Sequence, residues 1–146
     1  MEPIDWLTML DYQQTMHHLM RKLLHQSSQC TLTASELEIL SLLYLHPENN
    51  TPLELSRQSG AKKEAISRSL KQLFAKGFLE KTVNPLDERS YDLTLTQEGM
   101  EKLRENYGVI LQPMYDLQRK MGEEFETLFL LMKQANEKLE NKSLNQ

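Results

Sequence analysis

Two short helices joined by a glycine turn, between residues 51 and 77, are the feature that most constrains how this chain can fold. The first helix starts with the sequence Thr-Pro-Leu-Glu at 51–54, in which Thr51 suits the N-cap and Pro52 suits the first helical position. It is predicted to end at Gly60, and the second helix is predicted to continue to a stop at Gly77. Two helices joined by a tight turn of this kind form a helix-turn-helix.

A β-hairpin is predicted directly after these two helices. Residues 78–83 form a plausible strand, and residues 91–95 alternate apolar and polar side chains as an antiparallel partner would. Asn84-Pro85 marks the turn between them, which puts residues 87–89 at an exposed tip. A helix-turn-helix followed by such a hairpin is a winged helix, so the predicted fold is mainly α with a small β-hairpin.

Longer helices are expected on both sides of the winged segment. Apolar residues recur at helical spacing in residues 4–25, and a capping box at Thr33 begins a further helix. A long helix is expected from about 97 to 120, bent at Gly108 and Pro113. The last helix is expected at about 123–140.

The last predicted helix carries a seam of apolar residues at alternating spacings of three and four, as in a coiled coil. Because this helix and the first one lie outside the small winged core, we expect them to form a shared homodimer interface. The alternative is that the first helix covers the last within one chain. The expected interface residues are Leu7, Leu10, Phe125, Leu128, Met132, Ala135 and Leu139.

The distribution of charge favours nucleic acid although the whole chain carries a net charge of −4. Residues 51–90 contain eight basic and five acidic side chains, a net charge of +3, which leaves −7 for the rest of the 146-residue chain. For DNA binding the local field matters more than the total. A chain of this length corresponds to about one domain.

The second helix of the pair is the predicted recognition helix. A helix fits the major groove of DNA and presents the side chains of its first turns to the base edges. Arginine and lysine can donate to guanine, Glu64 can accept from cytosine, and Lys71 is placed to meet phosphate. The alternative is a solvated helix face with no ligand. The candidate residues are Lys62, Lys63, Glu64, Ser67, Arg68 and Lys71.

These features together resemble the MarR family of transcription regulators over nearly the whole chain. The resemblance rests on the wing motif Asp87-x-Arg89, followed by Leu93-x-Leu95-Thr96-x-x-Gly99. It also rests on residues 76–79, on Ser59-Gly60 and on Ser67-Arg68. It implies a single domain over residues 1–146, with a winged DNA-binding lobe at 31–97 and dimerisation helices at 1–30 and 98–146.

The resemblance also assigns a role to the wing. A guanidinium on a hairpin tip can enter a narrow minor groove, where the potential is most negative, and Arg89 is placed to do so. Asp87, two residues away, can brace that guanidinium. The alternative is a surface salt bridge worth less than roughly 1 kcal/mol.

The predicted function is that of a transcriptional regulator, by resemblance a repressor, which binds a palindromic operator as a homodimer. The resemblance also implies release by a small apolar or aromatic effector. The alternative is a winged-helix module that binds another protein and not DNA. The sequence names neither the operator, nor the effector, nor the regulated genes.

No enzymatic activity, cofactor or metal is expected. The chain is too short for an added catalytic domain and lacks a Gly-rich nucleotide loop, a metal-ligand cluster and an evident nucleophile–base pair. Its one cysteine, Cys30, has only polar uncharged neighbours and is not expected to sense oxidants. No apolar run approaches the roughly 18 residues that span a membrane, and no secretory signal is visible, so we expect a cytoplasmic protein.

Overall fold

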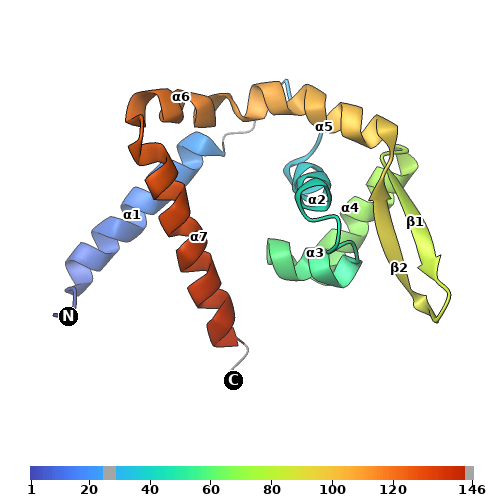
Figure 1. Ribbon diagram of the computed structural model, residues 1–146, viewed down its shortest axis with the longest axis horizontal. Coiled ribbons are helices and arrows are strands. Elements are labelled where there is room, and N and C mark those ends of the chain that lie inside the picture. The colour runs from blue at the N-terminus through green and yellow to red at the C-terminus, as the bar shows by residue number, and fades with distance from the viewer. Residues whose placement is uncertain (25–28, 144–146) are drawn as a thin grey trace. The chain divides into compact units, whose positions relative to one another are not determined.

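The computed structural model describes residues 1–24 and 29–143, which form seven helices and one two-stranded antiparallel sheet (Figure 1). They fall into two compact units: a winged lobe within residues 26–110, and a terminal unit within residues 1–25 and 111–146. The elements of the winged lobe are α2 (Ala34–Leu45), α3 (Pro52–Ser59), α4 (Lys63–Ala75), β1 (Leu79–Asn84), β2 (Asp87–Leu95) and α5 (Gln97–Ile110). The elements of the terminal unit are α1 (Trp6–Leu23), α6 (Gln112–Met121) and α7 (Glu124–Ser143).

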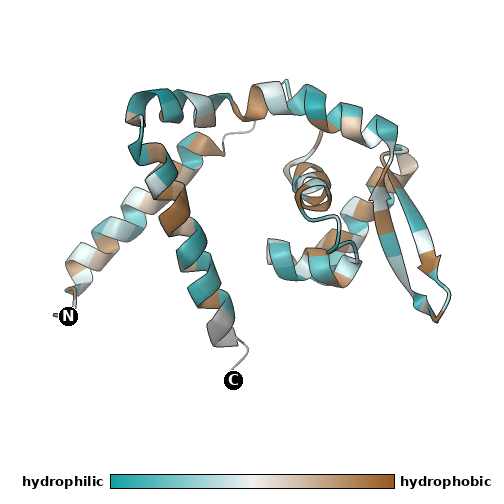
Figure 2. Cartoon of the chain, in the orientation of Figure 1, coloured by the Kyte–Doolittle hydropathy of each residue, from teal (hydrophilic) through white to brown (hydrophobic). Residues whose placement is uncertain are grey.

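The core of the winged lobe lies where α2, α3, α4 and the base of the hairpin meet (Figure 2). Its apolar side chains recur at helical spacing on α2 and α4. The buried members are Leu32, Ile39, Leu40, Leu43, Leu55, Ile66, Leu70, Leu73, Leu79, Leu93 and Leu103.

The predicted helix caps are present in the structure. The hydroxyl of Thr33 accepts a hydrogen bond from the Glu36 N–H at 3.1 Å, and that of Thr51 accepts one from the Glu54 N–H at 3.2 Å. Gly60 adopts a left-handed conformation with φ of 70°, which ends α3 and lets α4 start three residues later. The helix-turn-helix therefore follows from local sequence signals.

The hairpin differs from the prediction at its tip. We expected the second strand at 91–95 with Asp87 and Arg89 in the loop, but β2 begins at Asp87. Val83 pairs with Tyr91 and Asn84 pairs with Asp87, so residues 88–90 form a bulge in β2. The side chains of Asn84 and Asp87 accept hydrogen bonds from backbone N–H groups two residues ahead, each at 3.0 Å. These bonds stabilise a tight turn, and the pairing between the two strands extends as far as this turn.

The helix expected at 97–120 is two helices in the structure, α5 and α6. The break is at Leu111, and Pro113 lies in the first turn of α6, where its missing N–H is tolerated. Gly108 lies inside α5 and does not interrupt it.

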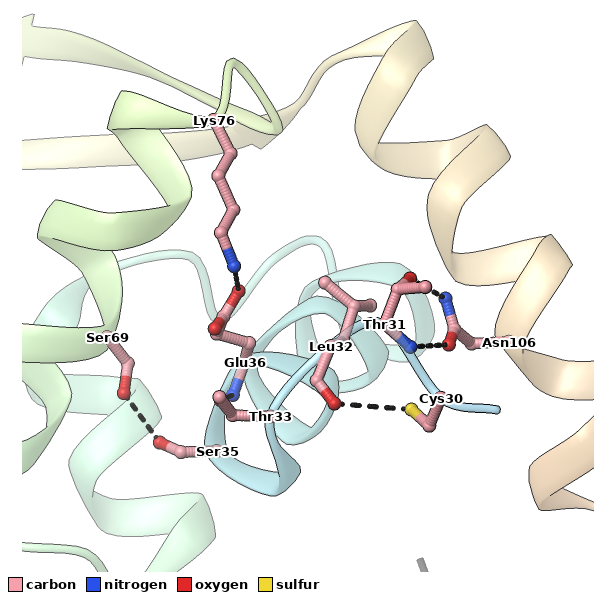
Figure 3. Close-up of polar contacts among 9 residues, drawn as sticks. All are labelled: Cys30, Thr31, Leu32, Thr33, Ser35, Glu36, Ser69, Lys76 and Asn106. Atoms are coloured by element: carbon pink, nitrogen blue, oxygen red, sulfur yellow. Dashed lines mark hydrogen bonds and ion pairs between the residues drawn. The ribbon is translucent and has the colours of Figure 1, made fainter. Parts of the chain in front are cut away.

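Helix α5 belongs to the compact unit of residues 26–110, together with the other elements of the winged lobe. The buried side chain of Asn106 accepts a hydrogen bond from the Thr31 N–H at 3.0 Å and donates one to the Lys102 carbonyl at 2.7 Å (Figure 3). These bonds attach α5 to the segment that leads into α2.

In the terminal unit, α1 is shorter than the predicted 4–25. Asp5 caps it by accepting hydrogen bonds from the N–H groups of Leu7 and Thr8 at 2.9 and 3.1 Å. It ends at Leu23, and residue 25 lies outside the described residues. Helix α7 extends three residues past the predicted end at 140.

The start of α5 is held against the base of the hairpin by a very close backbone approach. A Cβ atom added to Gly99 would lie 2.2 Å from the carbonyl oxygen of Phe78. The Thr96 hydroxyl bridges the same region, because it donates to the Gly77 carbonyl at 2.6 Å and accepts from the Gly99 N–H at 3.0 Å. Only glycine fits at position 99, which accounts for this glycine in the wing motif.

We expect Gly99→Ala to lower the free energy of unfolding by at least about 2 kcal/mol, because its methyl group overlaps backbone atoms that cannot move independently. Gly108→Ala is the matched control, since a Cβ there meets nothing within 4 Å. On the same helix it should leave stability unchanged or raise it by up to about 1 kcal/mol. Urea unfolding of both variants measures the difference, and equal stabilities would contradict the close approach.

Candidate nucleic-acid interface

Helix α4 separates an apolar side from a polar one. Ile66, Leu70 and Leu73 are buried, whereas the polar candidates all lie on the exposed side. Lys62 is the N-cap residue, and its side chain makes no capping hydrogen bond. The exposed candidates are Lys62, Lys63, Glu64, Ser67, Arg68 and Lys71.

Five of these six side chains surround one shallow surface hollow of about 460 Å³. Their spacing along the chain puts them on one helical face over more than two turns. The face carries three basic groups and one carboxylate: Lys63, Glu64, Arg68 and Lys71, with the Ser67 hydroxyl among them. This density of donors on one exposed helical face suits recognition of base edges and phosphates.

A second hollow, of about 490 Å³, brings the wing and the recognition helix together. Arg89, Ser90 and Tyr91 line it from β2, and Lys63, Ile66 and Ser67 line it from α4. The first turn of α3 closes it, through residues 51–53. We call this hollow the wing groove. It places the exposed Arg89 on the same surface as two of the predicted helix residues.

Asp87 has a different neighbour from the one that we expected. Its carboxylate accepts a hydrogen bond from the backbone N–H of Arg89, so the contact that the structure gives is with the main chain and not with the guanidinium. Asp87 therefore fixes the backbone on which Arg89 is carried.

Sequence reasoning missed Tyr91, which lines the wing groove, and its neighbour Lys81. The ammonium group of Lys81 lies 5.4 Å from the centre of the Tyr91 ring, which is cation–π distance. Lys81 pairs with Leu93 in the ladder, and Val83 pairs with Tyr91. The alternation that predicted the strands placed these side chains on the same face as the buried leucines, and this signal could have identified them.

Two polar contacts attach the recognition helix to α2 (Figure 3). The hydroxyls of Ser35 and Ser69 lie 2.7 Å apart, and the ammonium group of Lys76 lies 2.6 Å from Oε2 of Glu36. The Glu36 side chain is only 1% exposed, and its other carboxylate oxygen has no hydrogen-bond partner. A buried carboxylate with one cationic partner depends strongly on that partner.

Other candidate sites are weaker. The Cys30 thiol is half-buried and donates to the Leu32 carbonyl at 3.2 Å. Within residues 1–24 and 29–143, no group of three or more histidine, cysteine or acidic side chains could hold a metal ion. None of the described helices combines the length and apolar content that crossing a membrane requires.

Comparison with known proteins agrees with the motif and the fold. Residues 32–91 match the model of the MarR family. A curated relative, the uncharacterized HTH-type transcriptional regulator YdgJ of Bacillus subtilis strain 168, is 35% identical over 75 residues, which cover 51% of this chain. The matched segment spans 45% of that relative's length.

Solved structures of similar fold cover more of the chain. Wild-type MarR from E. coli in its apo form is 25% identical with a TM-score of 0.62, over 92% of this chain and 98% of that one. A mutant MarR from E. coli complexed with operator DNA is 23% identical with a TM-score of 0.68, over 90% and 99%. The fold is thus a winged helix-turn-helix, and residues 32–91 match the model of the family that the motifs indicated.

We expect Lys76→Met to lower the free energy of unfolding by about 1–3 kcal/mol, because it leaves the buried Glu36 carboxylate without its cation. This loss of stability should be smaller than for a fully buried ion pair, because the Lys76 side chain is 40% exposed. Arg57→Met is the matched control. It breaks the more exposed pair with Glu54, 2.8 Å long, and should cost less than about 1 kcal/mol.

Adding Glu36→Leu to Lys76→Met tests the cause directly. Removing the carboxylate as well as its cation leaves no buried orphan, so the double variant should lose less stability than the Lys76 variant alone. If the double variant is less stable than Lys76→Met alone, the stability lost in Lys76→Met does not arise from an unpaired charge.

Proposed function

We propose that the protein is a transcriptional regulator that binds double-stranded DNA in a sequence-specific manner. The observation that carries this proposal is the wing groove, which joins Arg89 of the wing to Lys63 and Ser67 of the recognition helix. A protruding helix beside a protruding ribbon suits DNA, because the two elements can occupy neighbouring grooves of one duplex.

Charge supports the same partner. Helix α4 and its N-cap expose four basic side chains and one acidic one, in a chain whose net charge is negative. Lysine and arginine side chains on such a face neutralise phosphates and release the counterions condensed on DNA. The alternative, a winged module that binds only another protein, gives no reason for this local excess of positive charge.

Within this proposal the side chains divide by task. Arg68, Lys63 and Glu64 lie in the first two turns of α4 and read base edges in the major groove. Lys62 and Lys71 contact phosphates at the two ends of the face, and Ser67 donates within it. Arg89 reads the minor groove from the wing, and Asp87 holds the backbone that carries it.

The terminal unit supports a homodimer. Helix α1 exposes large apolar side chains on several sides, with Trp6 at 73% and Leu7 at 59% exposure, and Leu139 on α7 is 67% exposed. The ring centres of Phe125 and Phe129, in the first turns of α7, lie 4.7 Å apart with the ring planes tilted by 46°. An apolar surface of this extent indicates a partner. A second copy, related by a two-fold axis, matches the palindromic site expected for two recognition helices.

The regulatory details remain predictions. Repression and release by a small apolar or aromatic effector rest on the family resemblance. The family and the relative's name indicate a transcriptional regulator. The proposal includes the expectations of no enzymatic activity, no cofactor and a cytoplasmic location.

We expect Lys71→Ala and Arg68→Ala to weaken DNA binding in different ways. Loss of a phosphate contact by Lys71→Ala should flatten the plot of log affinity against log salt by roughly one unit, with little change in sequence preference. Arg68→Ala should relax preference at one base pair, at a cost of about 1–3 kcal/mol there. Fluorescence anisotropy on a palindromic duplex and its single-base variants measures both.

The control for these variants is Arg104→Ala, since Arg104 is exposed on α5 of the same lobe and lines neither hollow. It should bind DNA like the wild-type protein. If Lys71→Ala and Arg68→Ala also leave slope and preference untouched, α4 is not the element that reads DNA.

We expect the wild-type protein to sediment at twice its chain mass of 17.1 kDa. Replacing Leu128 and Met132 together by glutamate should give unfolded or aggregated chain, because the terminal unit would lose its apolar partner surface. Lys133→Glu, a change at the exposed position that follows Met132, should leave the dimer intact. A well-folded wild-type monomer at micromolar concentration would refute the dimer.

A further inference from the structure

The tip of the wing presents an apolar side chain to solvent. Leu86 is 95% exposed, the highest value among the large hydrophobic residues described apart from Met1. Val83, on the strand that leads into the turn, is 50% exposed. Turn positions of this kind usually hold Gly, Asn, Asp or Ser, so local backbone chemistry does not call for a leucine. A single exposed leucine is ordinary on a surface, and the case rests on how this one is held and on what surrounds it.

The backbone on both sides of Leu86 is fixed. Pro85 restricts the residue before it and has its own φ locked by its ring. The Asn84 side chain accepts a hydrogen bond from the Leu86 N–H at 3.0 Å. On the other side, the Asp87 carboxylate accepts from the Arg89 N–H at 3.0 Å, and Asn84 pairs with Asp87 across the turn. The leucine is therefore held outward by a pre-organised turn, and cannot fold back onto the lobe without breaking these bonds.

Leu86 is followed along the chain by the acidic Asp87 and Glu88 and then by Arg89. The exposed Arg89 lies three residues further along β2 and lines the wing groove with Lys63. The ammonium group of Lys81 lies over the Tyr91 ring on the neighbouring strand. The ribbon thus has an apolar tip with two acidic residues beside it, and its cationic groups Arg89 and Lys81 lie further from the tip. The DNA minor groove has the complementary chemistry, because deoxyribose forms apolar walls between two rows of phosphates.

We propose that Leu86 is a DNA-contacting residue, which enters the minor groove as an apolar wedge ahead of Arg89. This inference rests on the proposed DNA-binding function and adds a contact that depends on burial of apolar surface and not on charge. Leucine is among the side chains that proteins insert into the minor groove for this purpose. Arg89 supplies the electrostatic part of the wing contact, and Leu86 supplies a part that salt does not screen.

The two contributions differ in their dependence on salt. Burial of apolar surface releases no condensed counterions, so loss of the Leu86 contact should lower affinity equally at all salt concentrations. Loss of the Arg89 contact should also reduce the slope of log affinity against log salt by about one unit. The salt slope therefore distinguishes an apolar contact from a general disturbance of the wing.

The test compares full-length variants on a duplex that the wild-type protein selects from a random DNA pool. Leu86→Ser should bind about tenfold more weakly with an unchanged salt slope. Leu86→Met should bind like the wild type, because it keeps an apolar side chain of similar size. Arg89→Ala should bind more weakly with a smaller slope. Leu45→Ser removes another exposed leucine of the winged lobe and should have no effect.

The apolar contact would be overturned if Leu86→Ser bound DNA as tightly as the wild type, or if its salt slope changed as much as that of Arg89→Ala. Either result would leave the proposed function in place. Failure of the wild-type protein to select or bind any duplex would overturn the proposed function, and this inference with it. Thermal unfolding of Leu86→Ser should match that of the wild type, because the side chain is exposed in the free protein.

Discussion

The backbone approach of Gly99 to Phe78 determines where the wing can lie. One glycine allows the first turn of α5 to approach the residue that precedes β1, and the Thr96 hydroxyl bonds both sides of the junction. The base of the hairpin is therefore fixed against the lobe by backbone contacts, which leave little freedom for rotation. Recognition helix and wing share one groove because this junction holds both strands beside α4.

Polar contacts inside the lobe complement this apolar and backbone packing. Glu36 and Ser35, from the first turns of α2, reach Lys76 and Ser69 at two points along α4. A buried ion pair contributes little net stability over an apolar pair, but it penalises any packing that separates the charges. In this lobe such a penalty opposes sliding of α4 along α2. The helix that carries the candidate DNA contacts is thus fixed in position as well as buried on one side.

The sequence predicted those features that depend on local signals. Thr33, Thr51 and Gly60 mark helix ends through hydrogen bonds and a left-handed turn within a few residues, and these caps are present. The start of β2 was not predictable in this way, because Asp87 has low strand propensity. Its pairing with Asn84 accompanies the hydrogen bonds that both side chains accept from backbone N–H groups of the turn.

Long-range contacts escaped prediction for a related reason. Asn106 bonds to Thr31 across 75 positions, and Lys76 bonds to Glu36 across 40, so no local pattern indicates either pair. The first pair attaches α5 to the segment that leads into α2. In the candidate site, the helical face was predictable from its spacing. The position of Arg89 beside that face could not be predicted, because it depends on the bulge in β2 and on the backbone junction at Gly99.

The bulge at residues 88–90 makes the length of the wing as important as its composition. Strand side chains alternate between the two faces of a ribbon, so the removal of one residue between Arg89 and Tyr91 reverses the face on which Arg89 lies. A deletion there would turn the guanidinium away from the wing groove while every charge and every helix stayed in place. Descendants of this chain could therefore lose wing contacts in one genetic step, through an insertion or deletion in this short segment. They could regain the contacts in the same way, more readily than through substitutions.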